Sequence, residues 1–475
     1  MNKNHISIIK ELKKHAASQG GMRILSQLEF AVKLSKVNEG RFDKQIAFVA
    51  NYLMQQIKQD GVITDKAAAA AELDLQELAA YAKKYTMICA AHAHIDMNWM
   101  WDYSETVAIT LETFRTMLNL MEEYPEFTFS QSQASVYKIV EKHDPAMLAE
   151  IKKRVAEGRW EVTASTWVEA DKNMPNGESH ARHLLYTRKY LMDLLDLSPE
   201  SFEIDYEPDT FGHSLNIPEI LSKGGVKYYY QCRGYEGHHI YKWKAPSGAS
   251  VIVFREPLWY NMDIAPAVAL HVPEFCEENG LDSILYVYGV GDHGGGPTRR
   301  DLEKLIDMNT WPVYPNIKFG TYIEFFKELE KISDRLPIVE GELNFVFTGC
   351  YTTQTRIKTA NRIGEAKLDE AESVCALAAN FLAESYPAPD FEGSWRKLLF
   401  NQFHDILPGS GVVDTREFAM GEFQKILAYA NTGMTLAYRN IAMKINTASL
   451  LPDGEALDAE RSEGGGAGFG LAGFG

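Results

Sequence analysis

The sequence predicts an α/β protein, with a parallel-strand α/β barrel-like or open-sheet central domain, an N-terminal helical cap and a C-terminal helical bundle. Two observations predict this class. Between about residues 85 and 335, short β-branched or aromatic runs alternate with helical patterns, which implies parallel strands joined by crossover helices. On both sides of this region, helical patterns continue without strands. The 475 residues, 45% of them hydrophobic, are enough to bury a large core.

The elements follow in this order along the chain. Residues 1–84 carry helical periodicity, with Thr64 as a plausible N-cap, and form the expected cap. The α/β domain, 85–335, contains strand-like runs at 86–91, 127–131, 160–165, 202–206, 226–232, 251–255 and 284–290. Between the first two runs, an amphipathic helix is predicted by the spacing of Val107, Leu111, Phe114, Leu118 and Met121.

Beyond the α/β domain the strand pattern disappears. Helical stretches at 356–383, 394–404 and 415–447 predict a bundle over 336–447, and the glycine-rich residues 448–475 have the composition of a linker or tail. Such a linker suggests a further domain, so we expect an exposed apolar patch on the bundle or the barrel. We also expect the chain from about residue 455 to be poorly ordered or packed only by Phe469, Leu471 and Phe474.

Composition narrows the function classes. Lys and Arg (48) against Asp and Glu (65) give a net charge of −17, which disfavours nucleic acid and anionic lipid as partners. No run of about 18 apolar residues indicates a membrane span, and the N-terminus lacks the apolar core of a signal peptide. Five scattered cysteines without a CxxC pair indicate a reducing compartment. We therefore expect a cytoplasmic protein without nucleic-acid or membrane partners.

The densest polar segment, residues 91–101, follows the first predicted strand. In an extended chain His92, His94 and Asp96 lie on one face, where imidazole and carboxylate groups can converge on an ion. An HxH pair alone is equally consistent with a surface or core position. Trp99 and Trp101, however, resemble the flat apolar platforms on which sugar rings or bases stack.

Three further segments carry candidate groups. Residues 205–214 follow another predicted strand and hold four of them, although a polar loop that caps the next helix explains them as well: Asp205, Glu207, Asp209 and His213. Residues 286–297 are rich in glycine but lack the lysine of a phosphate loop, so a mobile loop carrying Asp292 and His293 is the better interpretation. His404 ends a predicted helix, where a lone histidine is usually structural. Together, the four segments favour a metal site with carboxylate catalysis.

These motifs carry a family resemblance. The segment from His92 to Trp101, residues 208–214, the loop 291–297 and residues 401–405 resemble the α-mannosidases of glycoside hydrolase family 38. Residues 160–171, 177–179 and 351–356 are similar to the cytosolic and bacterial branch of that family. The resemblance runs in order from about residue 86 to 445. It implies a metal-dependent retaining α-mannosidase that hydrolyses α-linked mannose from oligosaccharides by double displacement.

The resemblance also implies residue roles. His94, Asp96, Asp209 and His404 would hold one divalent cation, usually Zn²⁺ in the family, so that the helical bundle contributes one ligand. Asp209 would be the nucleophile and Asp292 the acid/base, although a neighbouring position supplies the acid in part of the family. Trp99 would form a stacking wall, and substrate hydroxyls would be held by Glu169, Asp171 and Asp405.

Members of the family normally continue through β domains, so a separate β-domain chain or a homo-oligomer is an implied partner. A metal-dependent amidohydrolase or polysaccharide deacetylase is an alternative, because HxH after a first strand suits that chemistry too. An amidohydrolase, however, needs a bridging Lys or further strand-end His ligands, and the nearest candidates, His238 and His239, lie in a glycine-rich turn. A third hypothesis is a truncated carbohydrate-binding protein without turnover.

Overall fold

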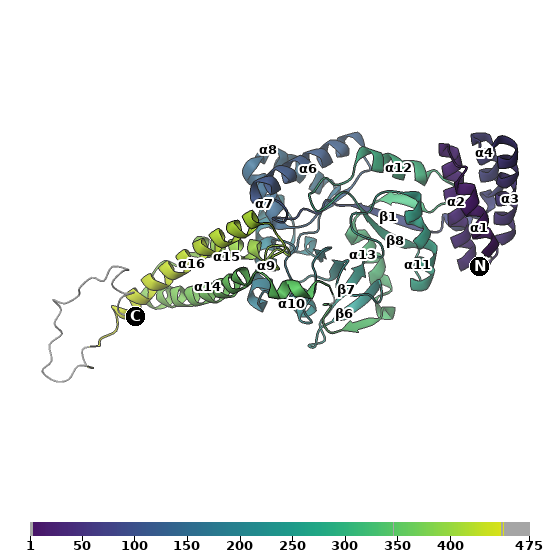
Figure 1. Cartoon of the computed structure of the whole chain (residues 1–475). Coiled ribbons are helices and arrows are strands. Elements are labelled where there is room, and N and C mark those ends of the chain that lie inside the picture. Colours follow the sequence, from purple (N-terminus) through teal and green to yellow (C-terminus); the bar gives the residue numbers. More distant parts are fainter. Residues whose placement is uncertain (1–2, 345, 448–449, 451–475) are drawn as a thin grey trace.

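The protein is described by a computed structural model that covers residues 3–344, 346–447 and 450. The N-terminal helices lie at one end of the molecule, the sheets in the middle, and the long C-terminal helices extend from the other end (Figure 1). The N-terminal elements are α1 (Lys3–Lys13), α2 (Gln19–Val37), α3 (Asp43–Asp60), α4 (Asp65–Asp74), η1 (Gln76–Leu78) and α5 (Ala79–Ala82). Thr64 caps α4 as predicted, since its side chain accepts a hydrogen bond from the Ala67 backbone N–H.

The N-terminal helices pack around an apolar core and join the central region through α2. Leu28 and Leu53 are fully buried in that core. Gln27 on α2 accepts a hydrogen bond from the backbone N–H of Val313, and Lys33 on the same helix pairs with Glu274. These polar contacts fix the helical region against the edge of the α/β region.

The strands of the central region form three sheets. They are β1 (Thr86–Ala91), β2 (Phe129–Gln131), β3 (Trp160–Val162), β4 (Ile204–Glu207), β5 (Tyr228–Gln231), β6 (Ile240–Lys244), β7 (Ser250–Arg255), β8 (Ser283–Tyr288), β9 (Asn316–Phe319) and β10 (Ile338–Glu340). β1 lies between β8 and β9, β2 pairs with β3, and the third sheet has the order β10-β6-β7-β5-β4.

Parallel pairing dominates these sheets, which confirms the predicted α/β class. In the described part of the chain only β6 and β7 pair antiparallel among the named strands. A single parallel bridge from His92 to Ser130 connects the ends of β1 and β2. The described strands do not close into one ring, so the barrel-like arrangement is a set of neighbouring open sheets.

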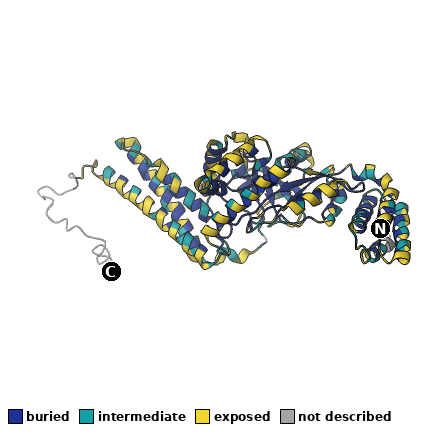
Figure 2. Cartoon of the chain, turned by 90° about the horizontal axis from the view of Figure 1, so that it is seen from above, coloured by how far each residue is buried: buried dark blue, intermediate teal, exposed yellow. Residues whose placement is uncertain are grey.

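Helices cover the sheets and bury their apolar faces. They are α6 (Tyr103–Glu123), α7 (Ala134–His143), α8 (Pro145–Ala156), α9 (Gly177–Leu195), η2 (Pro199–Ser201), α10 (Ile217–Lys223), η3 (Pro266–His271), α11 (Val272–Asn279), α12 (Arg299–Asn309), α13 (Tyr322–Lys331) and η4 (Ser333–Arg335). Phe114 and Leu118 of the predicted amphipathic helix are buried on α6. Figure 2 shows buried residues concentrated in the central region.

The C-terminal helices are η5 (Thr348–Thr352), α14 (Thr355–Leu382), α15 (Ala388–Asn401) and α16 (Val413–Ala442). α14 and α16 run side by side away from the sheets (Figure 1). Their outer parts expose large apolar side chains, among them Phe381, Leu436 and Met443. These single exposed residues do not establish the expected contiguous patch, which stays a prediction, and the expectation for Phe469, Leu471 and Phe474 lies outside the described residues. No helix in the described ranges has both the length and the apolar character needed to cross a membrane.

Candidate active site

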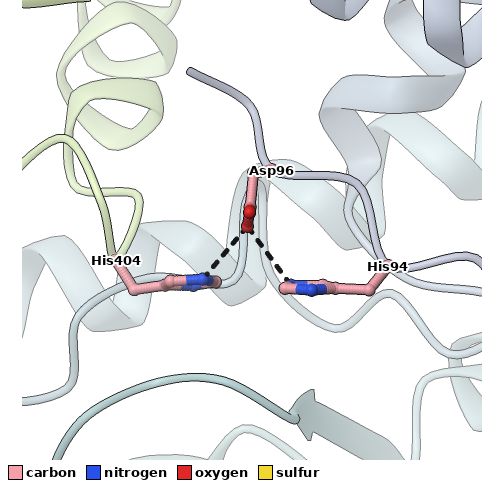
Figure 3. A group of neighbouring side chains, drawn as sticks. All are labelled: His94, Asp96 and His404. Atoms are coloured by element: carbon pink, nitrogen blue, oxygen red, sulfur yellow. Dashed lines mark ion pairs between the residues drawn. The ribbon is translucent and has the colours of Figure 1, made fainter. Parts of the chain in front are cut away.

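Two histidines and an aspartate from distant parts of the chain form a cluster beyond the end of β1. His94 and Asp96 follow that strand, and His404 comes from the turn between α15 and α16. Asp96 Oδ1 lies 3.6 Å from His94 Nε2 and 3.4 Å from His404 Nε2. Figure 3 shows the two rings on either side of the carboxylate.

The cluster meets the chemical requirements of a cation site. The three facing atoms, His94 Nε2, Asp96 Oδ1 and His404 Nε2, are buried and form no hydrogen bond of regular geometry, although Glu169 Oε2 lies 2.8 Å from His94 Nε2. Buried polar atoms are normally paired, because an unpaired one loses its hydration without compensation. One carboxylate oxygen and two imidazole nitrogens that point at one another suit a divalent transition metal. These residues could therefore hold an ion.

The Nδ1 atoms of both histidines, on the side of the ring away from Asp96, also contact oxygen acceptors. His94 Nδ1 lies 3.3 Å from Asp292 Oδ1, and His404 Nδ1 lies 2.9 Å from the main-chain carbonyl oxygen of Glu169. In a metal-bound site these acceptors would hold a proton on each Nδ1 and leave the Nε2 lone pairs to the ion, which would replace the present contact of His94 Nε2 with Glu169 Oε2. Asp292 is thus placed where it orients His94 as well as lining the pocket described below.

His92 and Asp209 do not join the cluster. The expected alignment of His92 with His94 and Asp96 fails, because the chain leaves regular strand geometry after Ala91. His92 instead packs against Tyr206, with ring centroids 4.3 Å apart and the ring planes tilted by 34°. Asp209 lies close enough to influence the cluster's titration, but its Oδ1 forms an ion pair with Arg233.

A pocket of about 640 Å³ opens beside the cluster. Four residues proposed from the sequence line it: Trp99, Asp209, Asp292 and Asp405. Other lining residues are Phe211, Arg233, Trp259, Tyr260, Phe347, Gly349, Cys350, Thr353, Pro408, Gly409 and Ser410. Carboxylates and aromatic faces around one cavity are the combination that recognises a sugar ring.

Glu169 and Asp171 have a different environment from the pocket carboxylates. Both are buried, and neither lines the pocket. Glu169 Oε2 lies 2.8 Å from His94 Nε2, and Ser132 donates to its other oxygen. Asp171 Oδ1 accepts from the backbone N–H groups of Asn173 and Met174, while burial raises the pKa of Asp171 to about 6.

The pKa values of two carboxyl groups near the cluster are shifted in opposite directions. Burial and the neighbouring Asp96 carboxylate raise the pKa of Asp405 to about 8. Burial would also raise the pKa of Asp292, but its hydrogen bond with His94 holds the pKa below the usual value. Asp292 is 37% exposed at the pocket and also accepts from the Tyr260 hydroxyl at 2.9 Å.

Sequence reasoning missed several pocket residues, Arg233 foremost. Its guanidinium pairs with Asp209 and lies over the ring of Trp259, 4.7 Å from the ring centroid, with Phe347 at 5.2 Å. Arg233 follows β5 by two residues, so the rule that ligands bind beyond the carboxyl ends of parallel strands could have pointed to it. Trp259, Tyr260 and Phe347 lie in loops that carry no comparable pattern.

Comparison with known protein families shows the family of this chain. The family described as glycosyl hydrolases family 38 N-terminal domain matches residues 84–345. The chain belongs to glycosyl hydrolase family 38. The alpha mannosidase middle domain, which matches residues 346–441, covers the segment that supplies His404.

Curated relatives of this family 38 chain are named as α-mannosidases. Alpha-mannosidase G of Dictyostelium discoideum is 30% identical over 74% of this chain and 33% of its own length. Human alpha-mannosidase 2C1 is 31% identical over 74% of this chain and 35% of its own length. The chain therefore spans about a third of the length of these relatives.

A solved structure supports the fold. The crystal structure of an alpha-mannosidase from Enterococcus faecalis V583 superimposes with a TM-score of 0.69 at 20% identity, covering 78% of this chain and 44% of that one. This superposition shows that the two chains share a fold over the aligned part.

Proposed function

We propose that this protein is a metal-dependent retaining α-mannosidase that releases α-linked mannose from oligosaccharides. The observation that carries the proposal is the buried group of converging ligand atoms on His94, Asp96 and His404 beside a carboxylate-lined pocket, in a family 38 chain. We also propose the division into a helical cap (1–84), an α/β catalytic domain (85–335), a helical bundle (336–447) and a tail (448–475), and a cytoplasmic location.

His94, Asp96 and His404 would hold a divalent cation, most simply Zn²⁺, with Asp209 as a further ligand when it turns from Arg233. When bound, such a cation supplies Lewis-acid stabilisation and a template for sugar hydroxyls. Four protein ligands exceed the three that are usual at catalytic zinc sites, so this site is proposed to accept additional oxygen ligands.

Asp209 is the proposed nucleophile. Its carboxylate, which pairs with Arg233 in this structure, would attack the anomeric carbon and form a covalent glycosyl ester as the leaving oxygen departs. Asp292 is the proposed acid/base: it would protonate the leaving oxygen and then remove a proton from the water that hydrolyses the ester. Because contact with His94 lowers its pKa, this role requires that substrate binding weaken that contact.

The remaining pocket residues have proposed binding roles. Trp99 offers a flat face for the sugar ring, and Asp405 reaches the pocket next to the cation cluster. Glu169 and Asp171 would act on substrate hydroxyls only if the pocket deepens toward them, since neither lines it here. The substrate is a neutral mannoside, because the three pocket aspartates face only one lining cation, Arg233, within the described residues.

The deciding experiment is hydrolysis of p-nitrophenyl α-mannoside by the full chain, with and without a chelator. We expect turnover that the chelator abolishes and added Zn²⁺ restores, and proton NMR should detect the α anomer as the first product. Asp209→Asn should abolish turnover and leave the circular-dichroism spectrum unchanged. A first-formed β anomer would exclude double displacement, acetate release from acetylated sugar would favour a deacetylase, and mannoside binding without hydrolysis would favour a carbohydrate-binding protein.

A further inference from the structure

Gln402 is a fully buried amide located two residues before His404. Its Nε2 donates to Ser179 Oγ and to Asn361 Oδ1, both at 3.0 Å, and Glu365 Oε1 lies 3.2 Å from the same nitrogen. Its Oε1 lies 3.1 Å from His183 Nε2. A single side chain thus connects two residues of α9 with two residues of α14.

The main chain at Gln402 connects the same turn to the α/β region. The backbone N–H of Asp171 donates to the Gln402 carbonyl oxygen at 2.9 Å, Ala170 and Phe403 form an antiparallel bridge, and the backbone N–H of His404 donates to the Glu169 carbonyl oxygen at 3.2 Å. The Glu169 carbonyl also accepts from His404 Nδ1. The orientation of the His404 ring therefore depends on the register of this short pairing.

The network spans the boundary between the two matched regions of the family. α9 belongs to the part matched at 84–345, and α14 and Gln402 belong to the part matched at 346–441. His94 and Asp96 come from the first part and His404 from the second. The cation cluster is complete only when these two parts are held in one relative position, and Gln402 bonds to both.

We propose that Gln402 is a positioning residue for the cation cluster: it fixes the turn that carries His404 against α9 and α14 without contacting the ion. The proposal rests on the cation site of the proposed function. It differs from a general packing role, because the lost hydrogen bonds would displace one ligand of the cluster rather than loosen the whole bundle.

The test measures metal binding rather than turnover. In the full chain, Gln402→Met keeps the length of the side chain but removes its donor and acceptor. We expect Zn²⁺ affinity, measured by competition with a chromophoric chelator, to fall by about 10–100-fold, the usual effect of losing a group that orients a metal ligand. The visible spectrum of the Co²⁺-loaded protein should change as well, since it reports ligand geometry.

Leu368→Ala is the matched control. Leu368 is fully buried on α14, about one turn from Glu365, and belongs to the hydrophobic core, so its truncation should lower Tm without changing Zn²⁺ affinity or the Co²⁺ spectrum. If Gln402→Met does not fold, Asn361→Ala serves instead. The Asn361→Ala variant lacks one hydrogen bond to Gln402, so its Zn²⁺ affinity should also fall, but by a smaller factor.

Unchanged Zn²⁺ affinity in Gln402→Met and Asn361→Ala, with Tm lowered as in Leu368→Ala, would overturn the proposal. The two proposals fail separately. A wild-type chain that binds Zn²⁺ but does not hydrolyse mannosides would contradict the proposed function alone, whereas a mannosidase whose Gln402 variants keep full Zn²⁺ affinity would contradict only the positioning role.

Discussion

Two buried clusters of charged and metal-ligating groups lie near the strand ends, and they compensate their charge differently. In the first, Lys172 Nζ lies 2.9 Å from Asp205 Oδ2 and 2.7 Å from Glu207 Oε1, with all three side chains at most 2% exposed. In the second, His94, Asp96 and His404 are equally buried, but Asp96 Oδ1 stands farther from its neighbours, 3.6 Å from His94 Nε2 and 3.4 Å from His404 Nε2, and both neighbours are imidazoles rather than an ammonium group. The first cluster contains its own cation.

The difference indicates what each cluster does. Asp205 and Glu207 belong to β4, directly before Asp209, and Lys172 also accepts a hydrogen bond from the Ser214 backbone N–H through its carbonyl. The Lys172 cluster therefore fixes the segment that carries the proposed nucleophile. The His94 cluster presents lone pairs toward a shared point, which suits an external ion. Two clusters that are similarly buried therefore differ in role: the Lys172 cluster supports the structure, and the His94 cluster suits ion binding.

The proposed difference between the two clusters requires that the His94 cluster bind an ion. We expect Asp96→Ala to eliminate stoichiometric Zn²⁺, measured by mass spectrometry of metals after dialysis. Mannosidase activity should fall at least about 100-fold, because a metal contributes several kcal/mol of transition-state stabilisation. Zn²⁺ retained at one ion per chain in this variant would place the cation elsewhere.

Removal of the internal cation tests the other cluster. Lys172→Met leaves Asp205 and Glu207 buried without a positive partner, so the free energy of unfolding should fall by about 3–5 kcal/mol. Denaturant unfolding of the full chain measures this change, and Lys172→Arg provides the charge-preserving comparison. Zn²⁺ content should stay near one per chain in the folded fraction. A small loss of stability would mean that the two carboxylates are compensated by other groups.

The sequence predicted the parts of the fold that local patterns control. The run at 86–91 coincides with β1, and the predicted amphipathic helix lies within α6. Both could be predicted because an apolar run and a 3.6-residue hydrophobic period can be recognised in a short stretch of sequence. The short strands β6, β9 and β10 were missed. The division into three sheets was also not predictable, since it depends on pairing between residues far apart in the chain, such as Thr86 with Asn316.

The same distinction between local patterns and long-range contacts applies to the site residues. His94 and Asp96 could be proposed from their place after a strand, whereas a single histidine in a helical segment gave no local reason to select His404; only the family resemblance did. The contacts of Asp209 with Arg233 and of His94 with Glu169 join residues 24 and 75 positions apart in the numbering. Asp205 and Glu207 were candidate polar groups by sequence alone, and the structure pairs them with Lys172.

The smallest expected effect concerns the proton balance within the Lys172 cluster. Burial raises the pKa of Glu207 from its usual 4.5 to about 8, although Lys172 acts in the opposite direction. Between these two values the folded protein holds a proton that the unfolded chain releases. The stabilising contribution of Glu207 is thus complete below 4.5 and is lost as the pH rises toward 8.

Glu207→Gln isolates this contribution, because the amide can still accept from Lys172 and does not titrate. We expect the Tm of the wild type, relative to that of Glu207→Gln, to decrease between about pH 5 and about pH 8.5. The change should be at least about 2–4 °C, which corresponds to about 1 kcal/mol in a large domain. If the wild type instead gains relative stability with rising pH, Glu207 is ionised in the folded protein and Lys172 compensates both carboxylates. The Thr210 hydroxyl, which already donates to Glu207, would then assist Lys172 by a neutral hydrogen bond to the second carboxylate.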